Sequence, residues 1–153
     1  MITIMGIDPG ASGSIAWTTD GKTCVEKMPE TLQDLWQLIE SITYTDFGEM
    51  RARYNDSGCK AYLESVHSMP GQGVASSFKF GQGFGRLEMA LTAAGIPFER
   101  VTPQKWQSAM GCMSKGDKNV TKRKAQELFP QMKCTHAISD GLLIMEYGRR
   151  LNQ

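Results

Sequence analysis

Residues 2–8 read Ile2-Thr3-Ile4-Met5-Gly6-Ile7-Asp8, an apolar run that ends on a carboxylate. Pro9 and Gly10 follow at once, and this pair is typical of a turn because proline fixes its φ angle and glycine adopts conformations closed to other residues. The run therefore predicts a strand that stops at Asp8. Asp-Pro-Gly is also a common turn sequence, so Asp8 by itself does not define a site.

Two further acidic residues lie in apolar surroundings. The run Ala61-Tyr62-Leu63-Glu64-Ser65-Val66 predicts a buried strand with Glu64 in its middle, where an ionised side chain is costly unless a cation compensates it. A buried ion pair, or a strand edge that faces water, is the alternative explanation. Asp140 follows His136 by four residues in a stretch with helical periodicity, so both side chains are predicted on one face of a helix.

Asp8, Glu64 and Asp140 thus come from three separate elements. Carboxylate oxygens are the ligands that Mg²⁺ prefers. Two such ions, held about 4 Å apart, cleave phosphodiesters by activating water and stabilising the leaving oxygen. The three acids together predict a two-metal site for phosphoryl chemistry.

Size and composition limit the remaining possibilities. The 153 residues are expected to form a single domain, 1–153, around one hydrophobic core. No apolar stretch approaches the roughly 18 residues of a membrane span, and no targeting segment is recognisable. We therefore expect a soluble intracellular protein without membrane contact. The four cysteines form no Cys-x-x-Cys pair and are expected to be free thiols.

The formal net charge of +1 conceals an asymmetry along the chain. Residues 1–99 hold 7 Lys and Arg against 12 Asp and Glu, whereas residues 100–153 hold 10 against 4. The basic residues of one late segment would suit a phosphate backbone, with a solvated helix face as the alternative. They are Lys115, Lys118, Lys122, Arg123 and Lys124.

The other patterns predict an α/β protein that opens with three antiparallel strands within residues 1–28. A later strand is predicted at 97–101, and helices at 31–42, 74–94, 104–110, 118–128 and 136–150. The helix at 74–94 contains Gly81, Gly83 and Gly85, and each glycine costs about 1 kcal/mol relative to alanine. We therefore expect DNA, a neighbouring helix or a second subunit to approach this helix closely.

These motifs, in this order, resemble those of the RuvC-type Holliday junction resolvases of the ribonuclease-H-like superfamily. The likeness covers the segments around Asp8, Glu64 and Asp140 and the stretch Val101-Thr102-Pro103-Gln104-Lys105-Trp106. It is most similar to phage and plant chloroplast forms, which share a Pro-Gly-Gln-Gly loop and a terminal stretch like Leu142–Gly148. The resemblance implies a ribonuclease-H-like mixed five-stranded sheet with helices on both faces.

The resemblance also implies an activity, a structure-selective endodeoxyribonuclease that cuts four-way junctions as a homodimer. Its catalytic and metal-binding residues would be Asp8, Glu64, His136 and Asp140, with two Mg²⁺ ions per site. His136 stands where the family has a fourth acid, and an imidazole there shifts the preference towards Mn²⁺ or handles a proton. A residue that starts a helix and faces solvent is the alternative for His136.

A junction nuclease also needs groups that hold branched DNA. Besides the basic cluster, Lys105 is expected near the cut strand, and the backbone of Gly71, Gln72 and Gly73 is expected to approach DNA closely. Met69 or His67 is a candidate to stack on an unpaired base. We expect the cytoplasm of a bacterium or of a phage host rather than an organelle.

Three other functions fit parts of the sequence. The segment Gly6-Ile7-Asp8-Pro9-Gly10 also resembles the phosphate-binding turn of actin-like kinases and ATPases, although 153 residues is short for their two domains. A junction-binding protein without catalysis would explain the missing fourth acid. A nuclease of the same fold that acts on other branched or RNA-containing duplexes is the third possibility.

Overall fold

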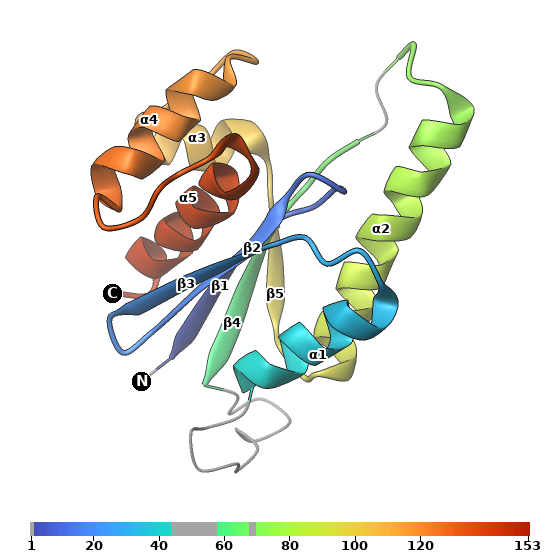
Figure 1. The fold of residues 1–153 in the computed structure, drawn as a ribbon, viewed down its shortest axis with the longest axis horizontal. Coiled ribbons are helices and arrows are strands. Elements are labelled where there is room, and N and C mark those ends of the chain that lie inside the picture. Colours follow the sequence, from blue (N-terminus) through green and yellow to red (C-terminus); the bar gives the residue numbers. More distant parts are fainter. Residues whose placement is uncertain (1, 44–57, 68–69) are drawn as a thin grey trace.

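The computed structural model describes residues 2–43, 58–67 and 70–153. Its sheet has five strands in the order β3-β2-β1-β4-β5 (Figure 1). Strands β1 to β3 pair antiparallel, whereas β1, β4 and β5 run parallel to one another. The strands are β1 (Thr3–Asp8), β2 (Ser14–Thr19), β3 (Lys22–Lys27), β4 (Cys59–Glu64) and β5 (Phe98–Val101).

Five helices in the described residues cover both faces of this sheet (Figure 1). Helices α1 and α2 lie on one face, and α3, α4 and α5 lie on the other. Each face has its own buried apolar cluster, as expected for a sheet that is covered on both sides. The helices are α1 (Leu32–Thr43), α2 (Val74–Ala93), α3 (Pro103–Met110), α4 (Lys118–Leu128) and α5 (His136–Leu151).

Side chains alternate along the central strands between the two clusters. On β1, Met5 and Ile7 belong to the cluster under α1 and α2, whereas Ile4 belongs to the cluster under α5. On β4, Leu63 and Tyr62 divide in the same way. Because successive strand residues point to opposite faces, the even-numbered residues of both strands face α5.

Helix α5 lies against the sheet so closely that glycines are required at the contact. A Cβ atom at Gly6 of β1 would overlap the Met145 backbone nitrogen, and one at Gly141 would overlap the Ser14 hydroxyl. Two helical turns after Gly141, a Cβ at Gly148 would overlap the Tyr62 ring. These glycines fix the height of α5 above β1 and β2, and hence the position of its first turns.

The observed elements confirm the predicted α/β architecture, including the opening antiparallel strands and helices on both faces. One detail was wrong: Glu64 is the last residue of β4 and does not lie in its middle. Ser65 and Val66 leave the strand because β5, the neighbour of β4, itself ends at Val101 opposite Glu64. No helix in the described part of the chain is both long and apolar enough to span a bilayer.

Candidate active site

Two of the predicted acids end neighbouring parallel strands. Asp8 is the last residue of β1 and Glu64 the last of β4, and the register pairs Ile7 with Leu63 directly before them. Both have even numbers, so both side chains point to the α5 face. The chain thus brings together two carboxylates that are 56 positions apart, at the edge of the sheet where β1 and β4 end.

The third acid, Asp140, comes from the second turn of α5. The adjacent Gly141 presses on Ser14, which pairs with Asp8 across β1 and β2. Glycine is also required at Gly13, where a Cβ would overlap the Asp8 backbone oxygen and come within 3.2 Å of the Asp8 carboxyl carbon. Gly13 therefore lies directly against Asp8, and Gly141 lets the start of α5 approach β2 beside it.

The three carboxyl groups influence one another's ionisation. Burial, and then the charges of Glu64 and Asp140, raise the pKa of Asp8 to about 8. Burial is also the main cause that raises the pKa of Glu64 to about 7, and the charge of Asp140 adds to it. The pKa of Asp140 is raised by burial as well, while the neighbouring Thr121 side chain acts in the opposite direction and lowers it. Neutral or shared-proton acids are expected here unless positive charge is supplied.

Part of that positive charge comes from Lys118, at the start of α4. Its ammonium group lowers the pKa of Asp8, Glu64 and Asp140, so it lies within electrostatic reach of all three. The sequence predicted Lys118 only as one of several phosphate contacts. Gly116, at φ 92°, and the N-cap residue Asp117 come directly before this helix and set where it begins.

Glu64 has a further partner that the sequence analysis did not identify. The Trp106 indole Nε1–H donates a hydrogen bond to Glu64 Oε2 at 2.7 Å, and both side chains are buried. Thr121 was also missed as a neighbour of Asp140. The available signal was helical spacing, since Trp106 and Met110 form the buried face of α3, but spacing alone does not reveal a hydrogen bond.

The remaining candidate residue of the site, His136, is the first residue of α5 and is exposed. It lies one turn before Asp140, and its charge lowers the pKa of that carboxyl. It is thus near the acids without being enclosed by them.

The fit of this site to a metal ion can be judged from its donor atoms. In residues 2–43, 58–67 and 70–153, no three side chains of His, Cys, Asp or Glu converge closely enough to hold an ion. Asp140 Oδ1, however, is buried without a hydrogen-bond partner among these residues, and such an atom needs an explanation. Carboxylates with one imidazole suit Mg²⁺ or Mn²⁺. The residues therefore fit such ions by the chemistry of their donor atoms, although the described side chains do not converge on one ion position.

The predicted DNA contacts form two groups on the surface. Along α3 and α4 and the turn between them, Lys105, Lys115 and Arg123 are exposed, Lys122 is half-buried, and Lys124 forms an ion pair with Glu127 at 3.2 Å. Gly71, Gln72 and Gly73 are exposed just before α2. Met69 lies outside the described residues.

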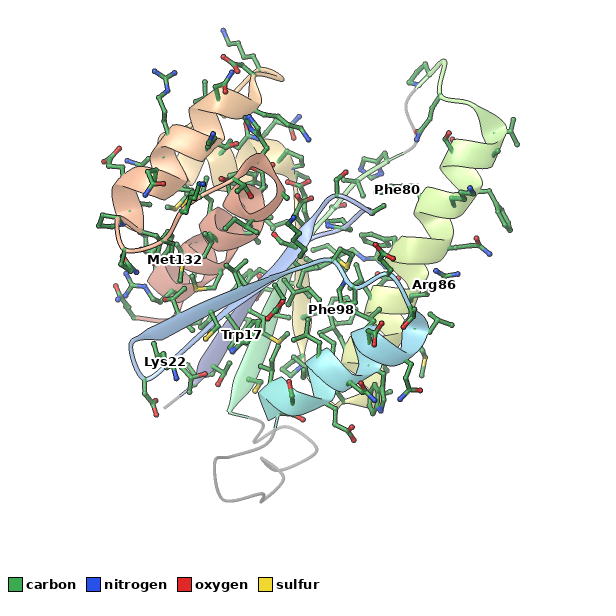
Figure 2. All side chains as sticks on the ribbon, in the orientation of Figure 1. Trp17, Lys22, Phe80, Arg86, Phe98 and Met132 are labelled. Carbon is green, nitrogen blue, oxygen red and sulfur yellow. The ribbon has the colours of Figure 1, made fainter. Side chains whose placement is uncertain are left out.

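A hollow of about 760 Å³ lies between the start of α1 and one side of α2. Lys79, Phe80 and Arg86 of α2 line it together with Gly10, which follows the Asp8 strand. Phe80 lies nearest that turn, 3.7 Å from the position of a Cβ on Gly10 (Figure 2). The hollow adjoins the β1–β2 turn but does not contain the acids.

Comparison with solved structures identifies the fold. Over 99% of this chain and 97% of the other, the structure is similar to RuvC of Thermus thermophilus, with a TM-score of 0.60 and 16% sequence identity. A T. thermophilus RuvC in complex with Holliday junction substrate gives a TM-score of 0.59 at 15% identity, over 98% and 96% of the two chains. No family model and no curated protein matches the chain. The ribonuclease-H-like, RuvC-like fold is thereby confirmed.

Proposed function

We propose that this chain is a structure-selective endodeoxyribonuclease that resolves four-way DNA junctions by metal-dependent phosphodiester hydrolysis. The observation that carries the proposal is that Asp8, Glu64 and Asp140 lie near one another at one edge of a RuvC-like sheet. The charges of Glu64 and Asp140 raise the pKa of Asp8, and the charge of Asp140 raises the pKa of Glu64. Carboxyl groups that disfavour one another's ionisation mark a site built for cations. Residues 1–153 would act as one nuclease domain.

Asp8, Glu64, Asp140 and His136 are the residues that would hold the ions, two per site. Bound Mg²⁺ or Mn²⁺ would supply an activated water and charge stabilisation for the leaving oxygen. Within the chain itself, β1 and β4 hold two carboxylates on one face, and α5 brings Asp140 against them. Burial of Glu64 excludes water from its side of the site, which strengthens its attraction for cations.

Branched DNA is the proposed substrate. The solved T. thermophilus RuvC that resembles this chain is bound to a Holliday junction substrate. Here the cations of α3, α4 and the turn between them lie on the same side of the sheet as the acids, so a strand held by them would pass the carboxylates. The exposed Gly71 and Gly73 precede α2, which covers the opposite face of the sheet, and they offer their backbone to DNA. Met69 remains proposed as a stacking residue.

Lys118→Gln should lower the cleavage rate by about 100-fold, because a cation beside the acids can stabilise charge on the cut phosphate. Junction affinity should fall much less. Arg123→Gln removes an equal charge from the same helix, at a side chain that is not among the causes shifting the pKa of the three acids, so it should weaken binding and reduce the salt slope by about 0.9 with the cleavage rate of the bound complex preserved. Single-turnover cleavage and binding at several salt concentrations separate the two effects. Equal effects of both variants would remove Lys118 from the site.

A homodimer is proposed because two strands must be cut at a fixed separation. The surface for it is a stripe along α2 formed by Val74, Phe78, Gly81, Gly85 and Met89, at helical spacing. Val74, Phe78 and Met89 are 87%, 67% and 62% exposed. A Cβ at either glycine would meet nothing within 4 Å among residues 2–43, 58–67 and 70–153. Large apolar side chains around such glycines suit close packing against a second helix.

Replacing Gly85 with Gln should shift the protein from dimer to monomer at micromolar concentration, because the new side chain fills the contact. Gly83→Gln, on another side of the same helix, should leave the dimer intact. Sedimentation velocity measures both. A wild-type monomer at micromolar concentration, or the same association for both variants, would contradict the dimer surface.

We further propose kinship with phage and plant chloroplast resolvases, and an intracellular location. The kinship is supported by the motif Leu142–Gly148, whose residues make structural contacts. Gly148 lies on the Tyr62 ring, and Tyr147 meets Tyr62 edge-on with ring centroids 5.9 Å apart. These contacts secure the C-terminal half of α5 on β4. Gly148 and Tyr147 thus stabilise the fold and do not belong to the site itself.

The direct test offers the purified protein four substrates with and without Mg²⁺: a synthetic four-way junction, a Y-fork, a linear duplex and an RNA–DNA hybrid. The proposal expects Mg²⁺-dependent cleavage of the junction in preference to the other three. Preference for the hybrid or the fork would favour a related nuclease instead. Tight junction binding without cleavage in either Mg²⁺ or Mn²⁺ would favour a binding protein that lacks catalysis.

A further inference from the structure

The buried contact between Trp106 and Glu64 joins the candidate site to the rigid interior. Trp106 is 0% exposed, and its Nε1–H donates to Glu64 Oε2 at 2.7 Å. This is a well-formed hydrogen bond to a carboxylate. Since the indole is buried, it does not reach DNA, and any influence on the chemistry would act through Glu64.

The backbone around Trp106 holds the donor in place. Val101 of β5 pairs with Glu64, so the chain leaves the sheet directly beside this carboxylate. Thr102 caps α3 by accepting the Lys105 N–H at 3.3 Å, and Pro103 occupies the first turn. Both features fix where a helix begins, and the fourth residue of α3 is Trp106.

An indole N–H is chemically suited to this position. It donates but cannot accept, and it carries no charge. It therefore stabilises the Glu64 carboxylate without competing with a metal ion as a lysine or arginine would. It engages Oε2, and so holds the carboxylate group through one of its two oxygens. Donors of this kind orient metal-binding carboxylates in other proteins.

We propose that Trp106 is a positioning residue that orients Glu64 for metal binding. The inference rests on the proposed function, since it assigns Glu64 to a Mg²⁺ or Mn²⁺ site. It extends that function to a residue of the core, whose ring volume and N–H group have separate tasks. The ring fills the cluster under α5, and the N–H fixes the carboxylate.

Trp106→Phe separates the two tasks, because it retains an aromatic ring and removes the donor. The variant should bind Mn²⁺, measured by electron paramagnetic resonance, about 10 to 100 times more weakly than the wild type. It should need correspondingly more Mg²⁺ for half-maximal cleavage while binding the junction normally without metal. The matched control is Trp36→Phe, a half-buried tryptophan of α1 on the other face of the sheet, which should change neither value.

A second measurement leaves Trp106 intact. The protein has three tryptophans, and Trp106→Phe identifies which indole N–H signal in a ¹⁵N-correlated spectrum belongs to residue 106. Mg²⁺ titration of the wild type should move that signal saturably and leave those of Trp17 and Trp36 unchanged. In Glu64→Gln the same signal should lie elsewhere and should no longer respond to Mg²⁺.

The outcomes separate this inference from the function on which it rests. Unchanged Mn²⁺ affinity in Trp106→Phe, while the wild type binds metal and cuts junctions, would overturn the positioning role and leave the nuclease proposal standing. A signal of Trp106 that ignores both Mg²⁺ and Glu64→Gln would do the same. A wild-type protein that neither binds Mn²⁺ nor cuts DNA would overturn both.

Discussion

Asp8→Asn, Glu64→Gln and Asp140→Asn are each expected to lower the rate of junction cleavage by at least about 1000-fold. Each variant removes a carboxylate charge that would hold a metal ion, and such an ion stabilises the transition state by several kcal/mol. Junction binding should persist or strengthen, because negative charge near phosphates is lost. His136→Ala should reduce cleavage less, and by an amount that differs between Mg²⁺ and Mn²⁺. Cleavage under single-turnover conditions and binding without metal provide the two readouts.

The matched control is Glu26→Gln, an exposed carboxylate on the edge strand β3. It changes charge equally and should leave cleavage at the wild-type rate. Full activity of any one of the three acid variants would remove that residue from the site. Loss of junction binding in all three, together with lower melting temperatures, would instead assign the acids to folding.

Gly6→Ala should lower the free energy of unfolding by at least about 4 kcal/mol, or prevent folding altogether. The added Cβ would overlap backbone atoms of Gly141 and Met145, which cannot rotate away as a side chain can. Either β1 or α5 must then move, and overpacking of this kind exceeds the usual 1–3 kcal/mol cost of an added methyl group in a core. Urea unfolding measures the change directly.

Gly83→Ala is the control for the same substitution in open space. A Cβ there meets nothing within 4 Å in the part of the chain that the structure describes, and alanine favours a helix over glycine by about 1 kcal/mol. We expect a small gain in stability. If Gly6→Ala were as stable as the wild type, α5 would not lie on β1 as closely as described, and the approach of Asp140 to Asp8 would need another explanation.

Much of the fold could be predicted because local signals and tertiary structure agree. The helix at 118–128 was predicted with the bounds that α4 has, since Asp117 caps it and Pro130 follows it closely. The end of β4 was missed because it is set by the length of β5, and a pairing partner far along the chain leaves no mark on residues 61–66.

The site was predictable only in part for a similar reason. The unusual placing of acids in apolar runs marked Asp8, Glu64 and Asp140. By contrast, the Trp106 hydrogen bond depends on the turn from β5 into α3, and the reach of Lys118 depends on how α4 packs beside α5. Both are tertiary distances between residues of ordinary type. From composition and spacing alone, Trp106 is equally consistent with an ordinary core tryptophan, and Lys118 with an ordinary surface lysine.

The most direct test of junction resolution uses a supercoiled plasmid that extrudes a cruciform. Two linked active sites cut opposite strands before the substrate relaxes, so the protein should convert the plasmid to linear molecules with ends at the cruciform, in Mg²⁺ and not in EDTA. Glu64→Gln should leave the plasmid supercoiled. Accumulation of singly nicked circles, or cutting away from the cruciform at the same rate, would contradict a dimeric nuclease that recognises the four-way junction.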